Sequence, residues 1–142
     1  MRITTLGTSH GSPTYCRFSS STLIETARGA YLVDAGSPVH ALLVRAGKSM
    51  DALRAAFVTH MHEDHAGGVH GLCKHFSKER SDARSGLRVF LPDQSDGTPL
   101  DAWCRARCFD WPNAAVSLAV TTAGEVYADD RITVRAESTR HM

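Results

Sequence analysis

Short runs of β-branched and apolar residues alternate along the chain with segments that carry apolar residues at helical spacing. The β-rich runs predict strands at residues 2–6, 20–26, 30–33, 53–59, 87–91, 116–120 and 132–136. Apolar positions three and four residues apart predict helices over residues 38–46, 67–78 and 99–107. This alternation indicates a domain of mixed α+β class.

Turn-forming residues mark where several of these elements begin and end. Arg28-Gly29 separates the second and third predicted strands by the spacing of a hairpin with a tight turn. Ser37 is expected to cap the first predicted helix, with Pro38 at its first helical position and Gly47 at its end. These signals place a pair of strands directly before a helix.

Composition and charge narrow the class of protein. The 142 residues are 42% hydrophobic and 22% charged, with a formal net charge of +1, so we expect a single globular domain over residues 1–142 without strong long-range attraction for RNA. Met1 leads directly into the first strand, and no apolar run is long enough to cross a bilayer, so a cytoplasmic protein without a membrane partner is expected. The four cysteines are expected to be reduced thiols.

The segment from Val58 to Gly68 contains three imidazoles and two carboxylates within six consecutive residues. It follows a predicted buried strand, and sites in open α/β folds gather at such strand ends. In an extended chain His60 and His62 point to the same side, so their nitrogens can converge on one ion. As the chain coils into the next helix, Asp64 and His65 can turn toward a second ion. The spacing therefore predicts two neighbouring metals.

Imidazole and carboxylate ligands without a thiolate suit a catalytic site better than a closed structural zinc site. Zinc is the expected metal, with manganese or iron as alternatives. Metal-bound hydroxide would attack a substrate, and a paired metal would stabilise the charge that develops, so hydrolysis is the expected chemistry. The metalloprotease motif His-Glu-x-x-His needs histidines four residues apart, whereas His62 and His65 are three apart. That motif is therefore excluded, and Glu63 is not assigned as its general base.

The segment Thr59-His-Met-His-Glu-Asp-His-Ala-Gly-Gly68 resembles the T-H-x-H-x-D-H-x-G-G signature of the metallo-β-lactamase superfamily. Leu6-Gly-Thr8 followed by Pro13-Thr14 resembles the opening of ribonuclease Z and related cyclic phosphodiesterases, and Leu32-Val-Asp-Ala-Gly36 resembles the turn that precedes the metal motif. The resemblance implies a four-layer αββα sandwich, of which this chain would form the N-terminal part.

The resemblance also implies roles for individual residues. Asp64 would be the catalytic residue, because it would both bind metal and orient the attacking nucleophile, and Asp34 would support the metal-bound histidines. The family's third metal motif is a histidine after a late strand. The implied ligands are His60, His62 and His141 for the first metal and Asp64 and His65 for the second.

The sequence departs from the family pattern after residue 142, where a bridging aspartate and a final histidine would follow. We expect a fragment of a longer protein. The alternatives are a short form that completes its site from another chain and a form that binds a single ion. A missing second half would leave apolar surface for homo-oligomerisation.

Three functions follow from this pattern. The leading hypothesis is a ribonuclease Z-like phosphodiesterase acting on a small-molecule or nucleotide phosphodiester, with RNA not indicated by charge. The second is a carbonyl hydrolase, such as a lactamase, lactonase or thioesterase, because fold alone does not decide the substrate. The third is a non-catalytic metal-binding module.

Overall fold

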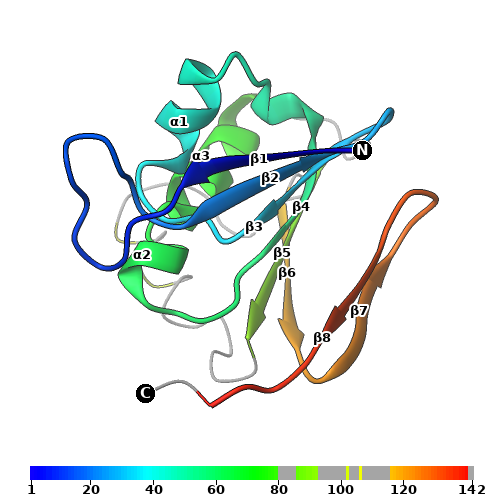
Figure 1. The fold of residues 1–142 in the computed structure, drawn as a ribbon. Coiled ribbons are helices and arrows are strands. Elements are labelled where there is room, and N and C mark those ends of the chain that lie inside the picture. Colours follow the sequence, from blue (N-terminus) through cyan, green and yellow to red (C-terminus); the bar gives the residue numbers. More distant parts are fainter. Residues whose placement is uncertain (80–85, 93–101, 103–105, 107–115, 141–142) are drawn as a thin grey trace.

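The computed structural model describes residues 1–79, 86–92, 102, 106 and 116–140. Six strands within these residues form one twisted sheet with the order β1-β2-β3-β4-β5-β6 (Figure 1). The strands β1 to β3 pair antiparallel, and β3 to β6 pair parallel. Their bounds are β1 Arg2–Gly7, β2 Ser21–Glu25, β3 Ala30–Val33, β4 Leu53–Phe57, β5 Leu87–Pro92 and β6 Val116–Thr121.

Helices cover one face of this sheet. They are α1 (Val39–Arg45), a short 3-10 helix η1 (Met50–Ala52), α2 (Glu63–Ala66) and α3 (Val69–Glu79). The apolar stripes of α1 and α3 are buried against the sheet, as their helical spacing predicts. The fully buried residues among them include Val39, Leu43, Leu72, Cys73 and Phe76.

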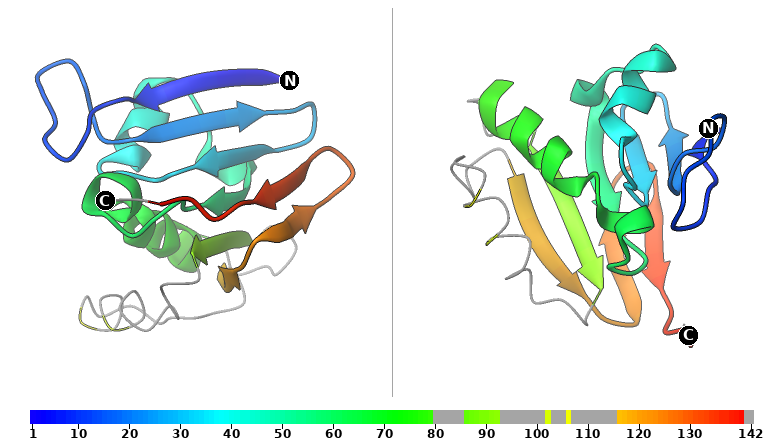
Figure 2. Two further views of the ribbon diagram at one scale, coloured as in Figure 1. Left: turned by 60° about the horizontal axis from the view of Figure 1, so that its bottom comes forward. Right: turned by 90° about the vertical axis from the view of Figure 1, so that its left-hand side faces the viewer.

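A hairpin of β7 (Gly124–Ala128) and β8 (Thr133–Ala136) lies on the opposite face and forms a second sheet within the described residues. Figure 2 shows the helices on one side of the main sheet and the hairpin on the other. Phe57 and Phe90 stack with their ring centroids 5.0 Å apart, and Tyr127 meets both rings edge-on. The described residues therefore form helical, sheet and sheet layers in that order, as an αββα sandwich requires.

Most predicted elements are present, although some details differ. The hairpin between β2 and β3 is confirmed, and Gly47 follows α1 with a positive φ of 68°. The expected cap on α1 is wrong, because Pro38 occupies the N-cap position and no side chain accepts a hydrogen bond there. The strand β7 was not predicted, and the predicted helix over residues 99–107 falls almost entirely outside the described residues.

None of the helices in the described part of the chain is both long enough and apolar enough to span a membrane.

Candidate metal centre

The candidate site lies where two neighbouring parallel strands end. Asp34 follows β3, and the histidine motif, Thr59–Gly68, begins just after β4. The backbone N–H of Asp34 donates to the carbonyl oxygen of Phe57 at 2.8 Å, which extends the pairing of the two strands to this edge. The carboxyl ends of parallel strands meet at one edge of a sheet, so the two segments are neighbours although 25 residues separate Asp34 from Thr59.

Asp34 is buried and adopts a positive φ of 59°, which is uncommon for a residue other than glycine. This backbone conformation turns its carboxylate toward the histidine motif. Its Oδ1 accepts from the Thr59 N–H at 2.9 Å and from the Thr59 hydroxyl at 2.8 Å, and its Oδ2 accepts from the Ser20 hydroxyl at 3.3 Å. Asp34 therefore joins the residue just before β2, the end of β3 and the start of the motif.

His65 is held by the same carboxylate. Its Nδ1 lies 2.6 Å from Asp34 Oδ2, so the Nδ1–H is donated to the carboxylate and the Nε2 lone pair is left outward. That Nε2 lies 3.5 Å from Asp64 Oδ2. Two ligand atoms of one tetrahedral ion, each about 2.0–2.1 Å from it, lie about 3.3 Å apart. This pair therefore has nearly the separation that a shared metal needs.

The three imidazoles of the motif are brought together. The ring centroid of His60 lies 4.7 Å from that of His62 and 4.0 Å from that of His65. His60 Nδ1 lies 3.1 Å from the Thr59 hydroxyl. The expected cluster of His60, His62, Asp64 and His65 is thus present as a group of neighbours at one edge of the sheet.

Backbone contacts seat the motif against the turn after β3. The N–H of Ala35 donates to the carbonyl of His65 at 2.7 Å, and the N–H of Gly68 donates to the carbonyl of Ala35 at 2.7 Å. A Cβ on Gly36 would collide with the backbone oxygen of Asp64, and one on Gly68 would lie 2.7 Å from the oxygen of Ala35. The two turns approach so closely that both positions require glycine.

These residues fit a divalent metal in chemical type and in the spacing of one ligand pair. Among the described residues, no group of three or more His, Cys, Asp or Glu side chains is arranged to hold a metal ion. His141, the predicted third ligand, lies outside the described residues. The ligand assignments for His60, His62, Asp64, His65 and His141 therefore stay predictions.

Two supporting residues were missed by sequence reasoning. Thr59 donates twice to Asp34, and Ser20 donates once from just before β2. Thr59 stands inside the motif, so its position was a usable signal. Ser20 precedes Asp34 by 14 residues, and only the pairing of β2 with β3 brings it to the site.

Several other histidines and cysteines of the described chain lie elsewhere. His75 lies 3.4 Å from Asp51 near the amino-terminal end of β4, far along the sheet from the motif. Cys73 lies on α3 and is buried in the core, whereas Cys16 is an exposed free thiol. Cys104 and Cys108 lie outside the described residues.

The layered fold and the histidine cluster at its strand ends define the class of protein. The metallo-beta-lactamase superfamily matches residues 14–95, and the chain belongs to that superfamily. Two ribonucleases Z are among its relatives. The protein from Synechococcus sp. (strain WH7803) is 31% identical over 99% of this chain and 45% of its own length. The protein from Pseudomonas putida (strain F1) is 42% identical over 61% of this chain and 27% of its own length.

Solved structures show the same fold. Human tRNase Z, short form, matches with a TM-score of 0.66 and 23% identity, over 83% of this chain and 44% of that one. The metallo-beta-lactamase fold protein YhfI from Bacillus subtilis matches with a TM-score of 0.73 and 18% identity, over 92% of this chain and 49% of that one. The chain spans less than half the length of each of these four proteins.

Proposed function

We propose that this chain carries the first metal motifs of a metal-dependent phosphodiesterase whose substrate is an RNA or nucleotide phosphodiester. The proposal rests on the orientation of the His65 imidazole. Its Nδ1–H donates to the Asp34 carboxylate, and its Nε2 lies 3.5 Å from Asp64 Oδ2. A carboxylate on one imidazole nitrogen orients the ring and makes the other nitrogen a better metal ligand. His60 and His62 supply two further imidazoles beside it.

Each residue would have a separate task. His60 and His62, with His141, would hold one divalent ion, and Asp64 and His65 would hold the second. Such ions, zinc first among them, supply Lewis acidity to a phosphoryl oxygen and activate water for attack. Asp64, half-buried, would act as the catalytic residue that orients the nucleophile. Asp34 would fix the imidazole of His65 without touching the substrate.

Two findings favour a phosphodiester over a carbonyl substrate. The ribonuclease Z relatives are 31–42% identical, and one of them matches 99% of this chain. The end of β1 and the loop that follows it also contain the Leu6-Gly-Thr8 and Pro13-Thr14 segments that resemble that branch. A carbonyl hydrolase and a non-catalytic metal-binding module are the outcomes against which the proposal is tested.

Metal content per chain is the first test of the proposal. Elemental mass spectrometry of the tag-free protein is expected to find about two zinc, manganese or iron ions per chain. The variant His60→Ala/His62→Ala is expected to lose at least one of them. The matched control His40→Ala/His75→Ala also removes two imidazoles, from α1 and α3, and is expected to keep its metal. Absence of metal after reconstitution would contradict a catalytic function for this chain.

A substrate panel tests the reaction. The metal-loaded protein is expected to cleave bis(p-nitrophenyl) phosphate or a short RNA and to leave a β-lactam, a lactone and a thioester intact. The variant Asp64→Asn, which keeps the size of the side chain but removes its charge, should abolish this cleavage. Cleavage of the carbonyl substrates alone would indicate the second hypothesis, and bound metal without any turnover would indicate a binding module.

A further inference from the structure

Within the described part of the chain, the β7–β8 hairpin is attached to the main sheet by side chains. The strands β7 and β8 pair only with each other, and the backbone N–H of Asp129 donates to the carbonyl of Ile132 inside their own turn. No backbone hydrogen bond between described residues joins the hairpin to β3, β4 or β5. The hairpin can therefore leave the main sheet without breaking any strand pairing of that sheet.

The described core is divided in the same way. One apolar cluster lies between the helices and the main sheet and contains no residue of the hairpin. The second lies between the two sheets and consists of Tyr31, Ala55, Phe57, Phe90 and Tyr127. Tyr127 is the one buried residue of β7 and β8. Loss of the hairpin would uncover the second cluster and leave the first intact.

The turn of the hairpin contains a carboxylate that is saturated with hydrogen-bond donors. Asp129 Oδ2 accepts from the Tyr31 hydroxyl at 2.5 Å and from the Tyr127 hydroxyl at 2.8 Å. Its Oδ1 accepts from the backbone N–H groups of Arg131 at 2.8 Å and Ile132 at 3.0 Å. An ionised carboxylate has about four lone-pair sites, so these four bonds use its full capacity.

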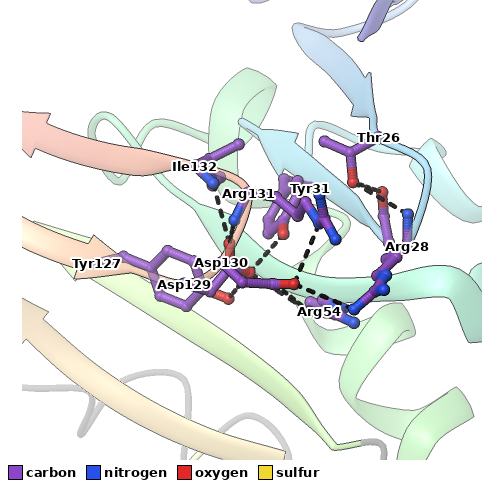
Figure 3. Close-up of polar contacts among 10 residues, drawn as sticks. Thr26, Arg28, Tyr31, Arg54, Tyr127, Asp129, Asp130, Arg131 and Ile132 are labelled. Atoms are coloured by element: carbon purple, nitrogen blue, oxygen red, sulfur yellow. Dashed lines mark hydrogen bonds and ion pairs between the residues drawn. The ribbon is translucent and has the colours of Figure 1, made fainter.

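A guanidinium of the main sheet reaches the same carboxylate. Arg54 on β4 lies 3.5 Å from Asp129 Oδ2, and its stem passes over Gly29, where an added Cβ would lie 2.6 Å from Cδ of Arg54. Figure 3 shows Tyr31, Arg54 and Tyr127 around Asp129. We call these four residues the Asp129 latch. The main sheet supplies Tyr31 and Arg54, and the hairpin supplies the other two, so the latch joins the sheets.

The neighbouring Asp130 is a natural contrast. Its carboxylate forms ion pairs with Arg28 at 3.5 Å, Arg54 at 3.7 Å and Arg131 at 3.1 Å. Its side chain is 51% exposed, whereas that of Asp129 is 15% exposed. Exposed ion pairs are screened by solvent and contribute little. Asp130 therefore serves as a matched position for comparison.

We propose that the β7–β8 hairpin is a separately opening unit of this fold and that the Asp129 latch holds it closed. A region with few buried apolar contacts opens at lower free energy than the core of a domain. A two-stranded hairpin is at most marginally stable by itself in water, so the opened hairpin also loses its own pairing. Opening exposes the rings of Phe57 and Phe90. The proposal is independent of the metal-dependent function proposed above.

Native-state hydrogen exchange followed by mass spectrometry tests the separate opening. In the wild type, amides of residues 124–136 are expected to exchange faster than those of β3 and β4. Their rates are expected to rise less steeply with low concentrations of urea, because a local opening exposes less surface than global unfolding. Equal rates and equal urea dependence in the hairpin and the main sheet would overturn the proposal.

A core variant distinguishes local from global opening. Val69 on α3 is buried in the first cluster, away from the hairpin. Val69→Ala weakens the core that remains closed when the hairpin opens, so it is expected to speed exchange in β3 and β4 and to leave residues 124–136 at wild-type rates. Equal acceleration in both regions would show that the hairpin and the main sheet open together, and would overturn the proposal.

The latch is tested by comparing Asp129→Asn with Asp130→Asn. In Asp129→Asn the amide oxygen can still accept the two backbone N–H groups, but the amide nitrogen cannot accept from the phenols. Exchange of residues 124–136 is expected to be about 10–100-fold faster than in the wild type, as befits lost bonds to a buried charge. Asp130→Asn is expected to stay within about twofold of the wild type.

A second latch variant covers the case in which Asp129→Asn does not fold. Tyr31→Phe removes one donor and keeps both the ring and the carboxylate, so a smaller acceleration confined to the same direction is expected. Wild-type exchange in the hairpin of Asp129→Asn, or of Tyr31→Phe in its place, would show that the latch does not hold the hairpin. An acceleration in Asp130→Asn as large as that in Asp129→Asn would contradict the role of Asp129.

Discussion

At the scale of single residues, the site depends on which hydrogen-bond donors the two carboxylate oxygens of Asp34 accept from. One oxygen satisfies the backbone and hydroxyl donors of Thr59, and the other holds Nδ1 of His65. The left-handed backbone of Asp34 costs about 1–2 kcal/mol. This cost is offset by the hydrogen bonds that the turned carboxylate accepts, because each bond to a charged group is worth about 1.5–3 kcal/mol.

The variant Asp34→Asn tests this arrangement. An amide can still accept from Thr59 through its oxygen, but its nitrogen cannot accept the Nδ1–H of His65. Metal affinity is therefore expected to fall about 10–100-fold, measured by competition with a chromophoric chelator. The control Asp51→Asn changes an exposed aspartate beside His75 and is expected to leave affinity unchanged. Equal affinity in Asp34→Asn and the wild type would show that Asp34 does not orient the ligand.

At the scale of elements, the decisive feature is the packing of two turns at the ends of β3 and β4. His62 is the N-cap residue of α2 and has an extended backbone, and its carbonyl accepts from the N–H groups of His65 and Ala66 at 2.9 Å each. The short helix turns Asp64 and His65 back toward Asp34. Gly68 then permits the chain to pass against the carbonyl of Ala35 before α3 begins.

The variant Gly68→Ala tests the close approach of these turns. Its Cβ would lie 2.7 Å from the oxygen of Ala35 and 2.7 Å from Cγ1 of Val39, and neither atom has room to move in the packed core. A loss of about 1–3 kcal/mol in the free energy of unfolding is expected from urea titration. Gly11→Ala is the matched control, because nothing lies within 4 Å of its Cβ. Similar losses in both variants would refute the packing argument.

At the scale of the whole molecule, stability depends on the tie between the main sheet and the β7–β8 hairpin. Burial by itself would raise the pKa of Asp129, but the hydrogen bonds from Tyr31, from the Ile132 backbone and from Tyr127 outweigh it and hold the pKa well below its usual 3.8. Burial, followed by the hydrogen bond to Asp129, raises the pKa of Tyr31 from 10.0 to about 12. Both shifts favour charged Asp129 beside neutral phenols.

The sign of the pH dependence follows from these shifts. The contribution of Asp129 is present above pH 3.8 and is lost as pH falls toward its folded-state pKa, because protonation then favours the unfolded chain. The contribution of Tyr31 is present below pH 10.0 and is lost as pH rises through about 12. Unfolding free energies measured below pH 3.8 are expected to fall less steeply in Asp129→Asn than in Asp130→Asn. Identical acid profiles would contradict this assignment.

Local patterns in the sequence were enough to predict most strands of the main sheet, two of its helices and the residues of the histidine motif. Alternating apolar runs predicted the strands of the main sheet, and helical spacing predicted α1 and α3, because both periods reflect which side chains face a core. The motif residues His60, His62, Asp64 and His65 could be found by their spacing, since they lie within six positions of one another. Family membership followed from the same segment and is confirmed over residues 14–95.

Only the tertiary structure decided the contacts between distant segments. Ser20 and Asp34 meet because β2 pairs with β3, and Asp129 reaches Tyr31 across 98 positions because the hairpin packs on the main sheet. The strand β7 gave a weak signal, since Gly124 begins it and Tyr127 is its one buried residue. Spacing along a chain specifies local geometry, whereas pairing and packing of sheets bring together residues whose separation in sequence carries no information about their distance.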